Sequence, residues 1–197
     1  MKFRSLLPVL ALLLSFFSTV SVHAQPVTSA SKVKVTTELS QSAVLSGGSF
    51  QAVVVMDIED GWHINSHRPT LEWLIGTTLN LNLPEVIEPR DIQYPPFKEY
   101  EFSFAQGQLL HVYEGEAPIF LSFNVLENAT LGTYEVTGTL RVQACDDAVC
   151  LAPSNIPVSF TVQITDNPDE ISGAEITLFD EYVPGSGDFV TFDQAGE

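Results

Sequence analysis

The sequence predicts an all-β protein whose folded domain is an immunoglobulin-like β-sandwich. From Val33 to Thr165, apolar residues alternate with mostly polar ones in several separate segments. A period of two residues indicates strands with one buried face. Turn-forming sequences separate these segments, and no segment of useful length has a helical period. Short strands joined by regular turns, without helices, favour a sandwich, which we expect to occupy residues 32–166.

Four segments of this domain show the alternation most clearly. Their expected inward-facing residues are, in chain order, Phe50, Ala52, Val54, Met56 and Ile58, then Ile119, Leu121, Phe123 and Val125, then Tyr134, Val136, Leu140 and Val142, and then Ile156, Val158, Phe160, Val162 and Ile164. The expected turns are 46–48, 59–61, 128–132 and 152–155. The stretch 68–108 is less regular. Within it, 78–83 is compatible with a strand, and the aromatic-rich residues 94–104 indicate long loops or an irregular edge.

The first 24 residues have the features of an export signal peptide. Lys2 and Arg4 give it a positive start, and Leu6–Phe17 is an apolar run that is too short for a typical membrane-spanning helix. Small residues precede an expected cleavage site ahead of Gln25. We therefore expect a periplasmic protein whose mature chain is not inserted in the membrane, in a compartment where cysteines form disulfides.

The composition is strongly acidic, with a formal net charge of −17 at pH 7. Loss of Lys2 and Arg4 with the signal would leave six of the 8 basic residues against 25 acidic ones, a net charge of −19. Nucleic acid and anionic membrane surfaces are poor partners for such a chain. The acidity favours solubility or a salty habitat, with a basic protein partner as the alternative. Residues 167–197 are acidic, contain no Lys or Arg, and are predicted to be disordered.

Cys145 and Cys150 are the only cysteines, and Asp146 and Asp147 between them favour a turn that brings both thiols to the end of a hairpin. By loop-closure entropy, a ring of about six residues stabilises a fold by about 2 kcal/mol, against about 4–5 kcal/mol for a ring of about a hundred residues. The two adjacent carboxylates disfavour a thiolate, so the pair is expected to be a weak oxidant and a better electron donor. From this spacing a structural disulfide, a redox-active pair and a metal site are all open.

Three histidines offer a second reading of the same region. His63 and His67 would lie on one face of a continuous strand, and with His111 and the cysteines they could bind Cu(I) or zinc. The alternative is that they are surface histidines near a loop. Since the sequence contains no Cys-x-x-Cys motif and no histidine pair at zinc spacing, we expect no metal site and no cofactor.

Three segments, in this order along the chain, resemble one known family. Gly61–Ser66 is similar to an aromatic strand of that family, Val112–Glu116 to its cap loop, and Cys145–Pro153 to its active-site hairpin. From about Val33 to Thr165 the chain thereby resembles the periplasmic N-terminal domain of the thiol:disulfide interchange protein DsbD. The resemblance implies an immunoglobulin-like β-sandwich with a redox cysteine hairpin.

The resemblance also implies a function, that of a thiol:disulfide oxidoreductase domain. Such a domain receives electrons from a membrane electron donor and passes them to thioredoxin-like periplasmic proteins of the disulfide isomerase or cytochrome c maturation type. Cys150 would form the mixed disulfide with the downstream partner, and Cys145 would resolve it. A free-standing copy would need a separate reductant. The alternatives are a non-catalytic immunoglobulin-like binding module with a structural disulfide, or a copper-handling protein.

The resemblance further assigns residues around the two cysteines. Tyr113, Glu114 and Gly115 would form a cap loop, with the tyrosine ring over the sulfurs and its hydroxyl in water. Trp62, His63 and Asn65 would belong to the strand that faces the hairpin. For Trp62 a place in the sandwich core is the alternative to a wall beside the disulfide, and for Tyr113 a place in the core is the alternative to the cap.

Overall fold

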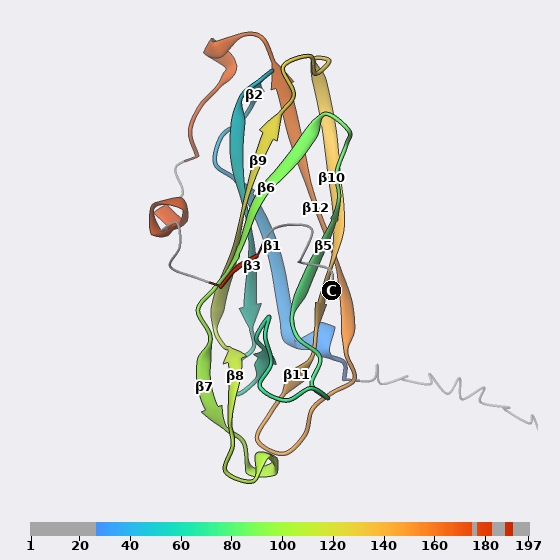
Figure 1. Cartoon of the computed structure of the whole chain (residues 1–197), viewed down its shortest axis with the longest axis vertical. Coiled ribbons are helices and arrows are strands. Elements are labelled where there is room, and N and C mark those ends of the chain that lie inside the picture. Colours follow the sequence, from blue (N-terminus) through green and yellow to red (C-terminus); the bar gives the residue numbers. More distant parts are fainter. Residues whose placement is uncertain (1–26, 175–176, 183–187, 191–197) are drawn as a thin grey trace, which may run out of the picture.

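The computed structural model describes residues 27–174, 177–182 and 188–190, and the predicted signal peptide lies outside them. The described residues form a sandwich of two long sheets with a smaller third sheet at one end (Figure 1). They include no α-helix, and their 3₁₀ turns are η1 (Ser29–Lys32), η2 (Ser103–Ala105), η3 (Pro168–Glu170) and η4 (Thr177–Glu181). The predicted all-β, immunoglobulin-like sandwich is confirmed.

The two long sheets are built mainly from antiparallel neighbours. The first sheet has the order β1 (Val33–Leu39), β3 (Ser49–Ile58), β9 (Glu116–Val125), β6 (Ile87–Tyr94) and β13 (Asp188–Val190). The second has the order β2 (Val44–Leu45), β12 (Ser154–Thr165), β10 (Gly132–Val142) and β5 (Thr78–Asn82). The small third sheet has the order β11 (Ala144–Cys145), β4 (His63–Asn65), β8 (Leu109–Tyr113) and β7 (Lys98–Glu101). It is a continuation of the sandwich, because β11 follows β10 directly and β8 leads into β9.

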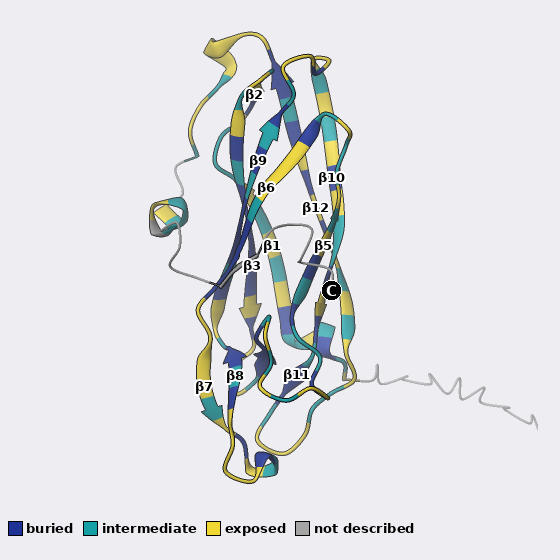
Figure 2. Cartoon of the chain, in the orientation of Figure 1, coloured by how far each residue is buried: buried dark blue, intermediate teal, exposed yellow. Residues whose placement is uncertain are grey.

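The main core lies between the two long sheets, where their apolar faces meet. In Figure 2 buried residues run through the middle of the sandwich, and exposed ones interrupt them along strands such as β10 and β12 and cover many of the connecting loops. Nearly all of the residues that the alternation placed inward are buried, with Tyr134 and Ile156 only partly so. Burial of these side chains is the main favourable term for folding. The alternation therefore located the core face of each long strand.

Tyr94, at the end of β6, ties the first sheet to the second. Its side chain is fully buried, and its hydroxyl accepts a hydrogen bond of 2.9 Å from the backbone N–H of Leu79 in β5. Burial raises the pKa of Tyr94 to about 12. A buried hydroxyl needs such a partner, because an unpaired polar group in the core is destabilising.

The stretch 68–108 is more regular than the sequence indicated. It contains β5, as expected, and also β6 and β7, which the sequence did not predict. Pro89 and Asp91 flank a register shift between β6 and β9, and this irregularity obscures the alternation of β6. The aromatic-rich segment forms β7 and η2 and packs at the end of the sandwich.

The described parts of the acidic tail contact the outer face of the first sheet. Leu178, Phe179 and Tyr182 pack against a cluster of Val53, Val55 and Phe120, and β13 pairs with β6. This contact explains why β3 is buried on both faces at its centre. The apolar side chains of these residues cover a sheet face that would otherwise be exposed, and disorder of residues 167–197 stays a prediction. The domain limits inferred from the sequence remain a prediction.

Candidate functional site

The two cysteines close a disulfide at the tip of the hairpin that follows β10. The S–S distance is 2.07 Å and the Cα atoms of Cys145 and Cys150 are 4.0 Å apart. Asp146 orders the turn between them: its Oδ1 accepts hydrogen bonds of 2.8 Å from the backbone N–H groups of both Ala148 and Val149. These bonds hold the pKa of Asp146 below its usual range. The predicted Asp-stabilised turn is thus present, with the first aspartate as its acceptor.

The two cysteines differ in exposure. Cys145 is part of β11 and is only 1% exposed, whereas Cys150 is half-buried and the neighbouring Val149 is 50% exposed. A reagent or protein that reaches this disulfide from solvent therefore meets Cys150 before Cys145.

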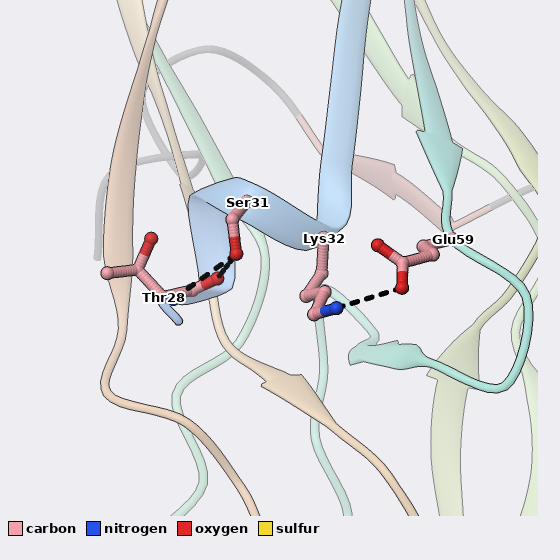
Figure 3. A network of polar contacts seen from close by, with 4 residues as sticks. All are labelled: Thr28, Ser31, Lys32 and Glu59. Carbon is pink, nitrogen blue, oxygen red and sulfur yellow. Dashed lines mark hydrogen bonds and ion pairs between the residues drawn. The ribbon is translucent and has the colours of Figure 1, made fainter. Parts of the chain in front are cut away.

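The inner base of the hairpin is held by η1 at the N-terminal end of the domain. The hydroxyl of the buried Ser29 accepts a hydrogen bond from Ala144 N–H (3.0 Å) and donates one to the carbonyl of Ala152 (2.7 Å), so it bridges both arms of the hairpin. The 3₁₀ turn η1 is closed by hydrogen bonds between Thr28 and Ser31 and ends at Lys32 (Figure 3).

The ion pair between Lys32 and Glu59 lies beside this turn. Lys32 Nζ is 2.8 Å from Glu59 Oε1 (Figure 3) and 4.7 Å from the centroid of the Trp62 ring. Trp62 packs against the main core. Of the two readings of Trp62, the structure supports the core one, because Trp62 precedes His63 and so faces the opposite side of the strand from the residue beside Cys145.

His63 is the direct neighbour of Cys145 across the ladder between β4 and β11. Directly opposed residues of an antiparallel pair point to the same face, with Cβ atoms about 4.5–5.5 Å apart. His63 is only 6% exposed, and its Nε2 lies 3.0 Å from Oε2 of Glu114. Its Nδ1 is buried and has no hydrogen-bond partner. The register therefore places His63 opposite the buried Cys145 in the third sheet.

Glu114 and Gly115 form the turn between β8 and β9. The carboxylate of Glu114 contacts His63 through one oxygen and Lys98 through the other, with Lys98 Nζ 2.7 Å from Oε1. The hydrogen bond from Lys98 holds the pKa of Glu114 below its usual range. Gly115 has a φ of 62°, in the left-handed region that favours glycine, and its carbonyl accepts a bond from Ile58 N–H. The segment predicted as a cap loop is thus a tight turn that places the Glu114 carboxylate against His63.

Tyr113 does not cover the disulfide, which corrects the expectation for it. The ladder places Tyr113 opposite Ile64, so its ring points away from the face of His63 and Cys145. Tyr113 is buried in the main core, and its hydroxyl accepts a 3.0 Å hydrogen bond from His67 N–H instead of lying in water. Sequence reasoning found the segment but not the direction of the side chain.

The cap over the disulfide comes from β7 and η2. A cluster of apolar side chains surrounds both cysteines, and its members are Leu71, Leu74, Tyr100, Phe102, Phe104, Ala105, Leu110 and Val112. The Tyr100 ring lies 4.0 Å from the His63 ring, and the Phe102 ring 5.3 Å from it. The Tyr100 hydroxyl and the Ser103 hydroxyl both donate hydrogen bonds to Asp147 of the hairpin. The only sequence signal for this cap was the aromatic-rich stretch 94–104.

Asn65, His67 and His111 contact groups other than the two cysteines. Asn65 is buried, and its Nδ2 donates hydrogen bonds to the carbonyl of Ile75 and to Oε1 of Gln143. The His67 ring stacks on Tyr94 and the His111 ring on Phe97, so the three histidines do not converge. Among residues 27–174, 177–182 and 188–190, no group of three or more His, Cys, Asp or Glu side chains is placed to hold a metal ion. Within the same ranges no helix has the length and apolar character needed to cross a bilayer.

Comparisons with known proteins found one matching family and several similar solved structures. Residues 29–161 match the model of a family described as thiol:disulfide interchange protein DsbD, N-terminal. Among solved structures, the N-terminal periplasmic domain of ScsB from Proteus mirabilis is similar with a TM-score of 0.44 and 15% identity, over 64% of this chain and 46% of that one. The reduced N-terminal domain of DsbD from Neisseria meningitidis is similar with a TM-score of 0.36 and 18% identity, over 64% of this chain and 85% of that one. This chain thus spans less than half of the ScsB chain. No curated protein sequence matches it.

Proposed function

Because the chain belongs to the family of N-terminal domains of the thiol:disulfide interchange protein DsbD, we propose that it relays electrons by thiol–disulfide exchange through Cys145 and Cys150. Family membership supports the exchange chemistry in general. The relay through these two sulfurs, its partners and its compartment are parts of the proposal.

The difference in exposure between the two sulfurs carries this proposal. Residue Cys150 is half-buried, whereas residue Cys145 is only 1% exposed, which favours Cys150 as the cysteine that a partner's disulfide reaches. In the reduced domain, the Cys150 thiolate attacks the partner's disulfide and forms a mixed disulfide, and one partner thiolate leaves. Cys145 then attacks Cys150, closes the ring and releases the partner's second thiolate. The domain loses two electrons and the partner gains them.

The proposed partners are thioredoxin-like proteins of the disulfide isomerase or cytochrome c maturation type, with a membrane protein as the electron donor. The proposed compartment is the periplasm. The exposed Val149 at the hairpin tip offers a partner an apolar contact beside Cys150. The surrounding cap would limit access to proteins that fit this end of the sandwich, since exchange itself does not discriminate between thiols.

Capture of a mixed disulfide tests the proposal. Reduced Cys145→Ser should trap an oxidised thioredoxin-like protein through Cys150, and Cys150→Ser should not. In addition, the disulfide should equilibrate with a thioredoxin-like protein, at a reduction potential above about −300 mV. A potential far below this value, together with no trapping, would instead indicate a structural disulfide in a binding module.

Cu(I) titration distinguishes the remaining alternative. The copper-handling reading requires uptake that is lost in Cys→Ser variants and in His63→Ala. The separation of His67 and His111 from the two sulfurs argues for the exchange reading.

A further inference from the structure

The Nδ1 atom of His63 has no partner in the disulfide form of the protein. His63 is 6% exposed, and Nδ1 is buried without a hydrogen bond, although a buried polar atom is normally paired. The imidazole is held on its other sides by the rings of Tyr100 and Phe102 and by Glu114. An orphaned nitrogen in such a fixed ring suggests that its partner is formed only in another chemical state of the site.

The contact with Glu114 identifies Nδ1 as a proton acceptor. The hydrogen bond from Lys98 keeps the Glu114 carboxylate ionised, so the carboxylate can only accept at the 3.0 Å contact with Nε2. In the neutral imidazole the proton therefore sits on Nε2, and Nδ1 carries the free lone pair. A carboxylate that orients an imidazole in this way is the arrangement by which a histidine activates a nucleophile.

The cysteine directly opposite His63 in the ladder is Cys145. His63 and Cys145 are directly opposed in the ladder of β4 and β11, and their side chains share one face of the third sheet. In the disulfide, Cys145 has no proton to donate. When the disulfide is opened, the Cys145 thiol gains a proton that it can donate, and His63 Nδ1 is an unpaired acceptor on the same face of the sheet.

We propose that His63, oriented by Glu114, is the general base that activates Cys145 in the resolution step of disulfide exchange. This inference rests on the proposed function and names the catalytic group of that same site. Cys150 holds the mixed disulfide, and the Cys145 thiol gives its proton to His63 Nδ1. The Cys145 sulfur then bonds to the Cys150 sulfur, the bond between Cys150 and the partner breaks, and the electron pair leaves on the partner's thiolate. His63 passes the proton to that thiolate, so two thiols of the domain become two thiols of the partner.

The charges that face His63 favour this role. Glu114 from the turn before β9 stabilises the imidazolium that forms, and Lys98 from β7 offsets the second oxygen of that carboxylate. Tyr100, also from β7, lies against the ring and stays neutral, since its hydrogen bond to Asp147 raises the pKa of Tyr100. On the side of β11 the facing group is Cys145 itself.

An uncharged disulfide reports the two steps separately. The full chain is reduced, freed of reductant and mixed with equimolar 2,2′-dithiodipyridine. Attack by Cys150 releases one pyridine-2-thione, and resolution by Cys145 releases the second, so stopped-flow absorbance gives two rates. The variants are His63→Phe, which keeps a ring, and Glu114→Gln. His111→Gln is the matched control, because His111 stacks on Phe97 away from the cysteines.

The expected result is a loss confined to the second phase. At about pH 7, where only a few per cent of an ordinary thiol is ionised, His63→Phe should slow the second phase by about tenfold or more, and Glu114→Gln should slow it by a smaller factor. The difference should shrink as the pH rises, because base from the solvent can then remove the Cys145 proton in place of His63. His111→Gln should match the wild type in both phases.

Other outcomes overturn the inference. Equal second phases in the wild type and His63→Phe at about pH 7 would exclude a base role, and an equal loss at every pH would show a structural one. If His63→Phe does not fold, an unchanged second phase in Glu114→Gln, with its pH profile unaltered, overturns the inference instead. If the wild type itself releases no second thione, the proposed function fails. If it does so and the variants match it, only the role of His63 fails.

Discussion

The Tyr100 hydroxyl donates a 2.8 Å hydrogen bond to Oδ1 of Asp147, and this bond fastens the cap to the cysteine hairpin. Tyr100 belongs to β7 and Asp147 to the turn between the cysteines, so the contact joins two segments that are distant in the sequence. A second contact, from Ser103 to the carbonyl of Asp147, runs alongside it. Opening the site to a partner must disturb these two bonds.

Removal of this fastening should make the disulfide more reactive. In Tyr100→Phe the ring on His63 stays and the hydroxyl is lost, so we expect reduction by a phosphine to become severalfold faster. Because the hydrogen bond raises the pKa of Tyr100, it should persist to pH values above the ordinary tyrosine value of about 10 and be lost at still higher pH. Tyr134 lies in β10 and its hydroxyl donates a hydrogen bond to the carbonyl of Thr130, so Tyr134→Phe removes a comparable hydroxyl away from the cysteines and serves as the control. Equal reduction rates in the wild type, Tyr100→Phe and Tyr134→Phe would show that the bond between Tyr100 and Asp147 does not protect the disulfide.

The turn acceptor Asp146 should control how readily the ring closes. Asp146→Ala removes both bonds to the N–H groups of Ala148 and Val149, and we expect the equilibrium constant for disulfide formation against glutathione to fall about five- to tenfold. Since the pKa of Asp146 is lowered in the fold, its contribution is present above its ordinary value of about 4 and is lost as the pH falls through the lowered value.

Hydrogen exchange gives a direct check of this turn. The amides of Ala148 and Val149 should exchange faster in Asp146→Ala, and should stay protected in Asp146→Asn, which retains an acceptor oxygen. Unchanged protection in Asp146→Ala would show that other contacts hold the hairpin.

The link between the two long sheets should be visible at alkaline pH. Tyr94→Phe leaves the N–H of Leu79 unpaired in the core, and we expect a loss of about 1–3 kcal/mol in the free energy of unfolding, measured by urea denaturation. Burial raises the pKa of Tyr94 from 10.0 to about 12. Because burial disfavours the ionised hydroxyl, the free energy of unfolding of the wild type should decrease as the pH rises from about 10 toward about 12, whereas Tyr94→Phe should lack this part of the pH dependence. If the wild type and Tyr94→Phe show the same dependence of the unfolding free energy on alkaline pH, Tyr94 does not link the two sheets in the way described.

The acidic tail should stabilise the sandwich without affecting the disulfide. Replacing both Phe179 and Tyr182 by Ala uncovers part of the cluster around Phe120, and we expect a loss of about 1–2 kcal/mol in the free energy of unfolding, since both rings are only partly buried. The rate of phosphine reduction should not change, because this contact involves the first sheet and not the third. An unchanged urea midpoint would mean that the described tail contacts contribute nothing to stability.

The sequence was most informative where structure follows from neighbouring residues. The period of two in β3, β9, β10 and β12 identified their buried faces, because successive strand residues point to opposite sides of a sheet. Asp146 and Asp147 predicted the turn for the same local reason, and proximity in the chain brought Cys145 and Cys150 together. The motif around His63 and the motif around Glu114 were both found, each as a short segment.

Side-chain direction at the site was decided by strand register in the third sheet. A shift of one residue sends a side chain to the other face, and short strands such as β4 and β11 have too little alternation to reveal their register. Hence Tyr113 was expected over the sulfurs but lies in the main core, and Trp62 faces the core as well. The aromatic cap of Tyr100 and Phe102 was missed because nothing local indicates where an irregular stretch will pack.

By itself, then, the amino-acid sequence determined the β-sandwich, the cysteine hairpin and the family, since these depend on periodicity, turn chemistry and short motifs. Only the tertiary structure placed Glu114 against Nε2 of His63, and His63 opposite Cys145. Those contacts join three strands that are distant in the chain. They exist because burial of the surrounding apolar side chains holds β4, β8 and β11 in one sheet. No single one of these three segments predicts that packing from its own sequence.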